Sequence, residues 1–381
     1  METTMLEILK RVPDYREGNA IRHVLSDILM IGLLTTISNG NGFAAMRIFG
    51  LEHEETLREF LSLPHGIPSQ DTFEHVFAKL NPKILRETFR SWIKELKDVD
   101  SPTGRLLASI DGKTLCGSID ENGKAVHIAT AFASELKLVL GEIATDKKSN
   151  EITAIPKLLE MFCQKGMVIT IDAMGTQTEI AAPIIEKKAD YVLSVKKNQG
   201  KLYTDVALGM EEMEINAAPE DREKLKEDGL YERTIEKGHG RIETRECFLS
   251  PDVSLLPTAS SWNGISGFGM IVSKREVIGK LPSIHRECFI FSLKNTTAEE
   301  MLHIKRSHWA IENNLHWTLD VVFREDDSRI RTKNAPENVN LLRKEAMQLL
   351  KAEQSFKGSM IAKRYRCSLN IDYALKVVGV K

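Results

Sequence analysis

Two short apolar runs that each end on an aspartate constrain this fold more than any other feature of the sequence. Arg105–Asp111 reads R-L-L-A-S-I-D, and Gly166–Asp172 reads G-M-V-I-T-I-D. Both runs have the length and composition of buried strands. A buried carboxylate must protonate, bind a cation or receive several hydrogen bonds. Either aspartate alone is more often a turn cap, but two at one sheet edge favour a divalent cation.

The segments around these runs predict a mixed sheet of the α/β class. Further strands are expected at Ala125–Ala133, Leu136–Ile143 and Tyr191–Val195, with helices at Glu151–Phe162 and Ile180–Lys188. Thr176 and Glu179 have the spacing of a capping box before the second helix. A strand, helix, strand order implies parallel neighbours joined by a right-handed crossover. The resulting order β-β-β-α-β-α-β is that of an RNase H-like domain.

The pattern of apolar and polar residues divides the chain into four parts. Residues 1–100 read as a helical domain, with a capping box at Asp71 and Glu74 and a buried apolar helix at His23–Thr36. Residues 101–200 form the first part of the core. Residues 201–295 contain strand-like pieces and are interpreted as a largely β insertion. Residues 296–381 contain a long helix, a second helix from Ala335 to Leu350 and an irregular end.

The long helix carries the third acidic candidate, Glu312. A capping box at Thr297 and Glu300 opens this helix, which is expected to continue to about Val321. One face is apolar, and a neighbouring stripe is polar and spaced at four residues. A solvated polar face is the plain alternative for Glu312 alone. A zinc site is less favoured, because its two histidines lie eight residues apart, roughly 12 Å of helix rise. The apolar face comprises Ile304, Ile311, Leu315 and Val322, and the polar stripe comprises His308, Glu312, His316 and Asp320.

Charge and composition narrow the class of protein. The net charge is −2, but residues 329–381 hold 12 Lys and Arg against 4 Asp and Glu. Such a basic end is typical either of a DNA phosphate contact or of a solvated tail. Five cysteines without a C-x-x-C pair fit a reducing compartment. No signal region is apparent, and Ile28–Thr36 is too short to span a membrane, so a cytoplasmic protein is expected.

Seven motifs in order along the chain resemble the H-repeat-associated branch of bacterial insertion-sequence DDE transposases. They are G-I-P-S-Q-D-T-F (66–73), I-D-G-K-T-L (110–115), S-N-E-I-T-A-I-P (149–156), I-D-A-M-G (171–175), K-K-N-Q-G (196–200), G-H-G-R-I-E-T-R (238–245) and H-W-A-I-E-N-N-L-H-W-T-L-D-V (308–321). The resemblance implies an RNase H-like core, an insertion before the last catalytic helix, and metal-dependent cleavage and strand transfer of DNA ends.

The same resemblance implies the site residues. Asp111, Asp172 and Glu312 would be the catalytic residues and the ligands of two Mg²⁺ or Mn²⁺ ions, because oxygen ligands suit these metals. If Glu312 fails, the third ligand is expected among Asp320, Glu325 and Asp326. The partners would be double-stranded terminal repeats and target DNA, bound by a homodimer associated with the nucleoid. Independently of the resemblance, basic and polar side chains are expected to contact DNA, with a solvated surface as the alternative: Lys113, Lys196, Lys197, Asn198, Arg241, His308, His316, Lys363, Arg364 and Arg366.

The sequence departs from the family pattern at two places. Related enzymes often carry Tyr, Arg and Lys around the glutamate where this chain has Lys305, His308 and Leu319. Cys116 stands where the family usually has Arg. Two other functions therefore stay open: an RNase H-like nuclease that does not join DNA, and an inactive DNA-binding remnant of a transposon.

Overall fold

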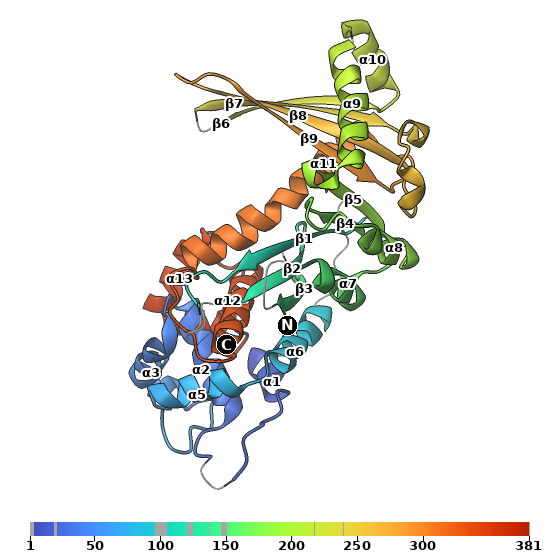
Figure 1. The fold of residues 1–381 in the computed structure, drawn as a ribbon. Coiled ribbons are helices and arrows are strands. Elements are labelled where there is room, and N and C mark those ends of the chain that lie inside the picture. Colours follow the sequence, from blue (N-terminus) through green and yellow to red (C-terminus); the bar gives the residue numbers. More distant parts are fainter. Residues whose placement is uncertain are drawn as a thin grey trace.

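The structure is a computed structural model, and it describes residues 4–18, 21–95, 105–119, 125–136, 138–145, 151–216, 218–238 and 240–380. The ribbon shows helices from both ends of the chain at one end of the molecule, a central sheet, and a projecting β ribbon at the other end (Figure 1). The turn signal expected at residues 121–124 lies outside the described residues.

The N-terminal part is helical, as predicted. Every residue of the second helix, α2, is buried, in line with its uninterrupted apolar sequence. The Ser69 hydroxyl caps α5 by accepting a hydrogen bond from the Thr72 amide at 3.2 Å, so the capping box expected at Asp71 is wrong. The helices are α1 (Met5–Lys10), α2 (Leu25–Ile37), α3 (Gly42–Glu52), α4 (Glu54–Leu57), α5 (Gln70–Lys79) and α6 (Pro82–Glu95).

No single helix of the described residues has both the length and the apolar composition to cross a membrane. By those two criteria alone, α2 and α3 pass as a pair, but they are bent by 99° at their junction.

The C-terminal part packs on these helices. The long helix α12 (Ala335–Ala352) contacts α2, α5 and α6, and its Asn338 amide donates to the Phe77 and Leu80 carbonyls at 2.8 and 2.9 Å. Two further helices follow, α13 (Met360–Leu369) and α14 (Ile371–Val377), so the irregular end expected from the sequence is wrong. The first and last parts of the chain therefore share one hydrophobic core.

The central sheet confirms the RNase H-like strand order. Its first five strands lie in the order β3-β2-β1-β4-β5, with β1 antiparallel to β2 and parallel to β4. Strand β1 continues three residues beyond Asp111, so this aspartate does not end its strand as expected. The strands are β1 (Leu107–Thr114), β2 (His127–Ala133), β3 (Leu138–Thr145), β4 (Val168–Ile171) and β5 (Asp190–Val195).

Two helices connect the parallel strands. Helix α7 has the predicted bounds, Glu151–Phe162, and α8 spans Thr178–Glu186. The expected capping box at Thr176 is wrong, because the Thr176 hydroxyl donates to the carbonyls of Asp172 and Ser194 at 3.2 and 2.6 Å. Thr176 thus ties the loop after β4 to the end of β5.

The insertion is not purely β and does not form a separate sheet. It begins with two helices, α9 (Lys201–Asn216) and α10 (Pro219–Glu227), which the sequence interpretation missed. Four antiparallel strands follow, and the last of them pairs with β5. The result is one sheet of nine strands in the order β3-β2-β1-β4-β5-β9-β8-β7-β6. The added strands are β6 (Tyr231–Gly238), β7 (Arg241–Ser250), β8 (Gly267–Val277) and β9 (Ser283–Phe291).

The last core helix begins where the sequence predicts but changes its winding. The Thr297 hydroxyl accepts from the Glu300 amide at 3.2 Å and opens α11 (Ala298–Ala310). The chain then continues as two π-helical segments, Ile311–His316 and Thr318–Val322. π-helical turns are rare and occur frequently at functional sites.

A buried carboxyl group in α12 predicts a pH-dependent stability. Burial raises the pKa of Glu345 from 4.5 to about 8, and its Oε1 atom has no hydrogen-bond partner among the described residues. Because the pKa is raised in the folded state, the protonated Glu345 carboxyl favours folding. This contribution to stability is fully present below pH 4.5 and is lost as the pH rises through 8. We therefore expect Glu345→Gln to raise the melting temperature more at pH 8.5 than at pH 5.

Thermal unfolding across this range measures the effect, since each unit of pKa difference is worth about 1.4 kcal/mol. Glu135→Gln, a half-buried carboxyl outside this core, is the control. If the difference in melting temperature between Glu345→Gln and wild type is the same at both pH values, the prediction is contradicted.

Candidate active site

Two aspartates leave neighbouring strands at the same level of the sheet. Ile110 of β1 pairs with Ile171 of β4 in parallel register, so the next residues, Asp111 and Asp172, lie side by side. Neighbouring strands are about 4.8 Å apart. This is the convergence that the two apolar runs predicted.

The surroundings of Asp111 disfavour the ionised form of its carboxyl group. Burial is the main cause, and the charges of Asp172, Glu151 and Glu312 add to it, so that the pKa of Asp111 rises to about 7. One hydrogen bond acts in the other direction: the Gly112 amide donates to Asp111 Oδ1 at 2.8 Å. A nearby cation would relieve both the burial and the repulsion.

Asp172 is held by the loop that follows β4. Its Oδ1 atom accepts hydrogen bonds from the amides of Met174 and Gly175 at 3.1 and 3.3 Å. The Asn198 amide donates to the Ala173 carbonyl at 2.8 Å and braces the same loop. Asn198, predicted as a DNA contact, thus has at least a structural role here.

Glu312 lies on the first π-helical segment and reaches solvent. Its neighbours Ile311 and Leu315 are fully buried against Phe132 and Val139 of the sheet, as the apolar stripe predicted. Partial burial raises the pKa of Glu312, the charge of Lys196 lowers it, and the charge of Asp172 raises it. Glu312 therefore shares an electrostatic environment with both aspartates and with Lys196.

The two histidines of the polar stripe face different partners. His308 Nδ1 lies 2.8 Å from Thr170 Oγ1, and His316 Nδ1 lies 3.4 Å from Asp111 Oδ2. Burial lowers both pKa values to about 3, so both rings are neutral. They do not share a site, which argues against the zinc alternative. His308 is neutral and its Nδ1 atom is hydrogen-bonded to Thr170, so its ring does not offer the charged phosphate contact that was predicted.

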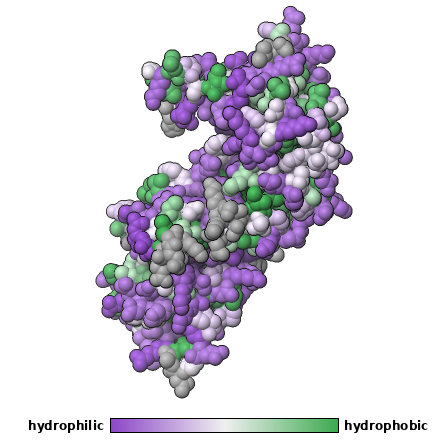
Figure 2. Space-filling model, viewed as in Figure 1, coloured by the Kyte–Doolittle hydropathy of each residue, from purple (hydrophilic) through white to green (hydrophobic). Residues whose placement is uncertain are grey.

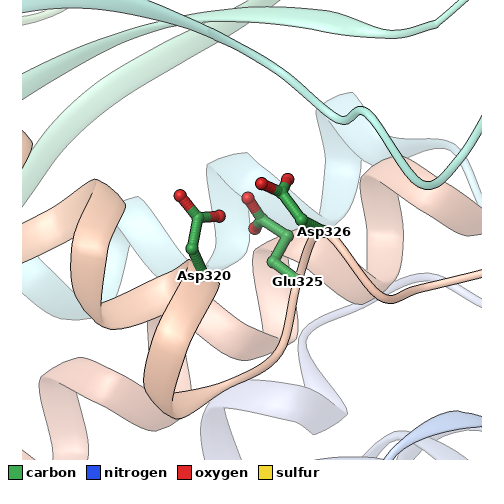
Figure 3. Close-up of side chains that lie close together, drawn as sticks. All are labelled: Asp320, Glu325 and Asp326. Carbon is green, nitrogen blue, oxygen red and sulfur yellow. The ribbon is translucent and has the colours of Figure 1, made fainter.

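Three other carboxylates lie close together, one in the second π-helical segment and two just after it. Ligand atoms of Asp320, Glu325 and Asp326 are all within 4.8 Å of one another, the only such acidic group among the described residues (Figure 3). Lys113 forms ion pairs with Asp320 and Glu325 and lies 4.0 Å from Asp326. One ammonium group therefore already offsets part of the negative charge of this cluster.

This arrangement corrects the role predicted for Lys113. Its side chain is 14% exposed and is directed to carboxylates, not to solvent, where a DNA phosphate would approach. The pairing also explains why Asp320 and Glu325 are weaker candidates for the third metal ligand than Glu312.

Two of the three predicted DNA contacts in the basic C-terminal segment are directed inward. Lys363 donates to the carbonyls of Leu350 and Glu353, and Arg364, 1% exposed, donates to those of Val322 and Thr36. The predicted phosphate contacts of these two residues are therefore wrong for this conformation. Arg366 is exposed and stacks on Phe356 and Tyr373, with its guanidinium 4.8 and 4.4 Å from the ring centres.

The remaining predicted DNA contacts lie at the surface. Lys196 and Lys197 are exposed directly after β5, at the same edge of the sheet as the aspartates. Arg241 opens β7, far along the ribbon, with its guanidinium 3.7 Å from Glu243. Only the two lysines are near the acidic site.

Sequence reasoning missed two buried pairs. Lys305 lies 2.6 Å from Glu287 and 2.6 Å from Ser194, joining α11 to β9 and β5. On the other side of β1, Glu151 lies 3.0 Å from His127, and both side chains pack under Gly112. The S-N-E-I-T-A-I-P string contains Glu151, which a helix-start interpretation alone does not mark as buried.

Comparisons with known proteins identify the family of this chain. The family model described as Transposase DDE domain matches residues 103–347, and one described as DDE_Tnp_1-associated matches residues 6–93. The chain is 36% identical to the Escherichia coli K12 protein named "H repeat-associated putative transposase YhhI", over 98% of this chain and 97% of the other.

Two further likenesses extend over nearly the whole chain. "Putative transposase YncI" of Escherichia coli O157:H7 is 36% identical over 99% of this chain and 94% of its own length. A solved piggyBac transposase synaptic complex with hairpin DNA matches 98% of this chain and 76% of that chain, at 12% identity and a TM-score of 0.40. By the family match and the full-length relatives, the chain belongs to the DDE transposase family, together with the H repeat-associated proteins of Escherichia coli.

Proposed function

We propose that this protein cleaves the ends of an insertion-sequence element and joins them to target DNA, with Asp111, Asp172 and Glu312 as the catalytic carboxylates. One observation carries the proposal: Asp111 and Asp172 leave paired positions of two parallel strands, and Asp111 has a raised pKa there. Supporting Glu312 as the third carboxylate, its charge acts on Asp111 and that of Asp172 acts on it, although its side chain is exposed.

The donor set fits a hard divalent cation. The three candidate ligands offer carboxylate oxygens, which Mg²⁺ and Mn²⁺ prefer, and the two neighbouring histidines lie against different residues, Thr170 and Asp111. Two such ions, when bound, would activate the attacking oxygen and stabilise the leaving 3′ oxygen. The chain's own part is to hold Asp111 through the Gly112 amide and Asp172 through the Met174 and Gly175 amides.

Surface features beside the site suit a DNA strand. Lys196 and Lys197 can contact backbone phosphates, and Trp309 and Trp317, 48% and 53% exposed, offer faces for unpaired bases. An indentation separates the β ribbon from the rest of the molecule, with a mainly hydrophilic surface (Figure 2). A cleft of about 520 Å³ between α11 and β6 lies there. A homodimer on double-stranded DNA is the expected assembly.

The test uses the full chain with DNA that carries the terminal repeats of its own element. With Mg²⁺ or Mn²⁺ we expect nicking at the repeat ends, followed by joined products when target DNA is added. Nicking without joining would favour the nuclease alternative. DNA binding without nicking in either metal would favour the inactive remnant.

A further inference from the structure

A second basic site lies where the N-terminal helices meet the end of the π-helical segments. The cleft has a volume of about 440 Å³ and is bounded by the start of α3, by residues 324–330 and by α12. Three arginines, Arg324, Arg329 and Arg343, and one aspartate line it. Arg324 and Asp327 form an exposed ion pair with each other at 2.9 Å.

Arg343 is the unusual member of this group. Its side chain is only 4% exposed, and it forms no hydrogen bond or ion pair with any part of the chain that the structure describes. A buried charge without a partner is costly. Such a residue is retained more readily where a ligand supplies the missing partner.

The carboxylate that acts on Arg343, that of Glu325, already has other partners. Glu325 acts on Arg343 electrostatically, but the Glu325 carboxylate pairs with Lys113 and accepts a hydrogen bond from Asn340. A second cation, Arg364, is close enough for the charge of Arg343 to lower its pKa. Figure 3 shows Glu325 beside Asp320 and Asp326, within that other cluster. The local balance at the cleft is therefore positive.

The start of α3 adds donors to the same cleft. Asn41, the residue before this 11-residue helix, provides no side-chain cap, and its amide can instead donate to the Phe323 carbonyl at 3.2 Å. Gly42 has a φ of +81°, and the space where a Cβ atom would be is open. Uncapped amides at a helix start attract anions.

We propose that this cleft binds a phosphate group of the DNA backbone through Arg343, Arg329 and the first amides of α3. The inference rests on the proposed function, since it requires that the chain bind DNA. A strand held there would touch both the N-terminal helices and the segment that follows Glu312. Arg343 would then act as a binding residue outside the three carboxylates.

The test compares Arg343→Gln and Arg329→Gln with Arg331→Gln, an exposed arginine that does not line the cleft. Binding of a 20-base-pair duplex of mixed sequence is measured between 50 and 200 mM NaCl. We expect about tenfold weaker binding for Arg343→Gln. The slope of log K against log salt should flatten by about 0.9 for each lost contact. Arg331→Gln should retain the wild-type slope.

Stabilisation by inorganic phosphate, measured beside duplex binding, distinguishes a DNA phosphate from a free one. The same data show whether the cleft assignment or the proposed function has failed. If the wild type binds the duplex and both cleft variants keep its slope, the cleft assignment is overturned while the proposed function stands. If the wild type binds no duplex, the proposed function itself fails. Stabilisation of the wild type by inorganic phosphate alone, with unchanged DNA slopes, would also overturn the DNA assignment. Should Arg343→Gln not fold, the exposed Arg329→Gln still decides.

Discussion

Asp111→Asn should abolish metal-dependent cleavage and leave DNA affinity within about threefold of wild type. The substitution keeps the volume and the Gly112 hydrogen bond but removes a charge that a divalent cation needs. It should also relieve the repulsion with Asp172, so thermal stability should stay equal or increase slightly. Cleavage of terminal-repeat DNA and filter binding measure the two effects.

Asp326→Asn is the matched control, because Asp326 belongs to the other acidic cluster and is 47% exposed. It should retain cleavage. The opposite result, an active Asp111→Asn and an inactive Asp326→Asn, would move the metal site to the cluster around Lys113.

Gly112→Ala should be a disruptive methyl addition beside the site. A Cβ atom at this position would lie 2.5 Å from both Glu151 Oε2 and His127 Nε2, and these two side chains are buried and bonded to each other. Overpacking of this kind costs about 1–3 kcal/mol. Because Gly112 also holds Asp111, we expect cleavage to fall by more than tenfold, and the melting temperature to fall as well.

Gly238→Ala serves as the comparison, since nothing lies within 4 Å of the added carbon in the same kind of strand. Its melting temperature and cleavage rate should match the wild type. Equal stability of the two variants would mean that β1 moves easily and that the Glu151–His127 pair does not hold Gly112 in place.

Local patterns predicted the parts of the fold that depend on nearby residues. The strand that ends just before Asp172, the α7 bounds and the Thr297 cap follow from periodicity and spacing, and all three appear in the structure, whereas β1 runs on past Asp111. Other features depend on distant partners. Lys113 shares its strand face with Asp111, but its carboxylate partners lie 207 and 212 residues away.

The count of basic residues did not predict which side chains can contact DNA, for a related reason. The excess of basic residues after position 329 is real, yet a count does not say which side chains turn inward. Arg364 donates to carbonyls of α2 and of the second π-helical segment, and Lys363 caps the end of α12. Likewise, Trp309 and Trp317 are exposed although tryptophans at such spacing are usually core. Only the three-dimensional packing distinguishes these cases.

The pairing of β9 with β5 gives the molecule a mechanical property. Because the ribbon and the catalytic strands belong to one hydrogen-bonded sheet, a load on the β6–β9 ribbon passes directly to β5. Lys305 adds a second connection between β5, β9 and α11. A partner or a DNA segment that presses on the ribbon would therefore strain the strand that leads into Lys196 and Lys197. The insertion is thus continuous with the sheet that carries Asp111 and Asp172, not an independent attachment.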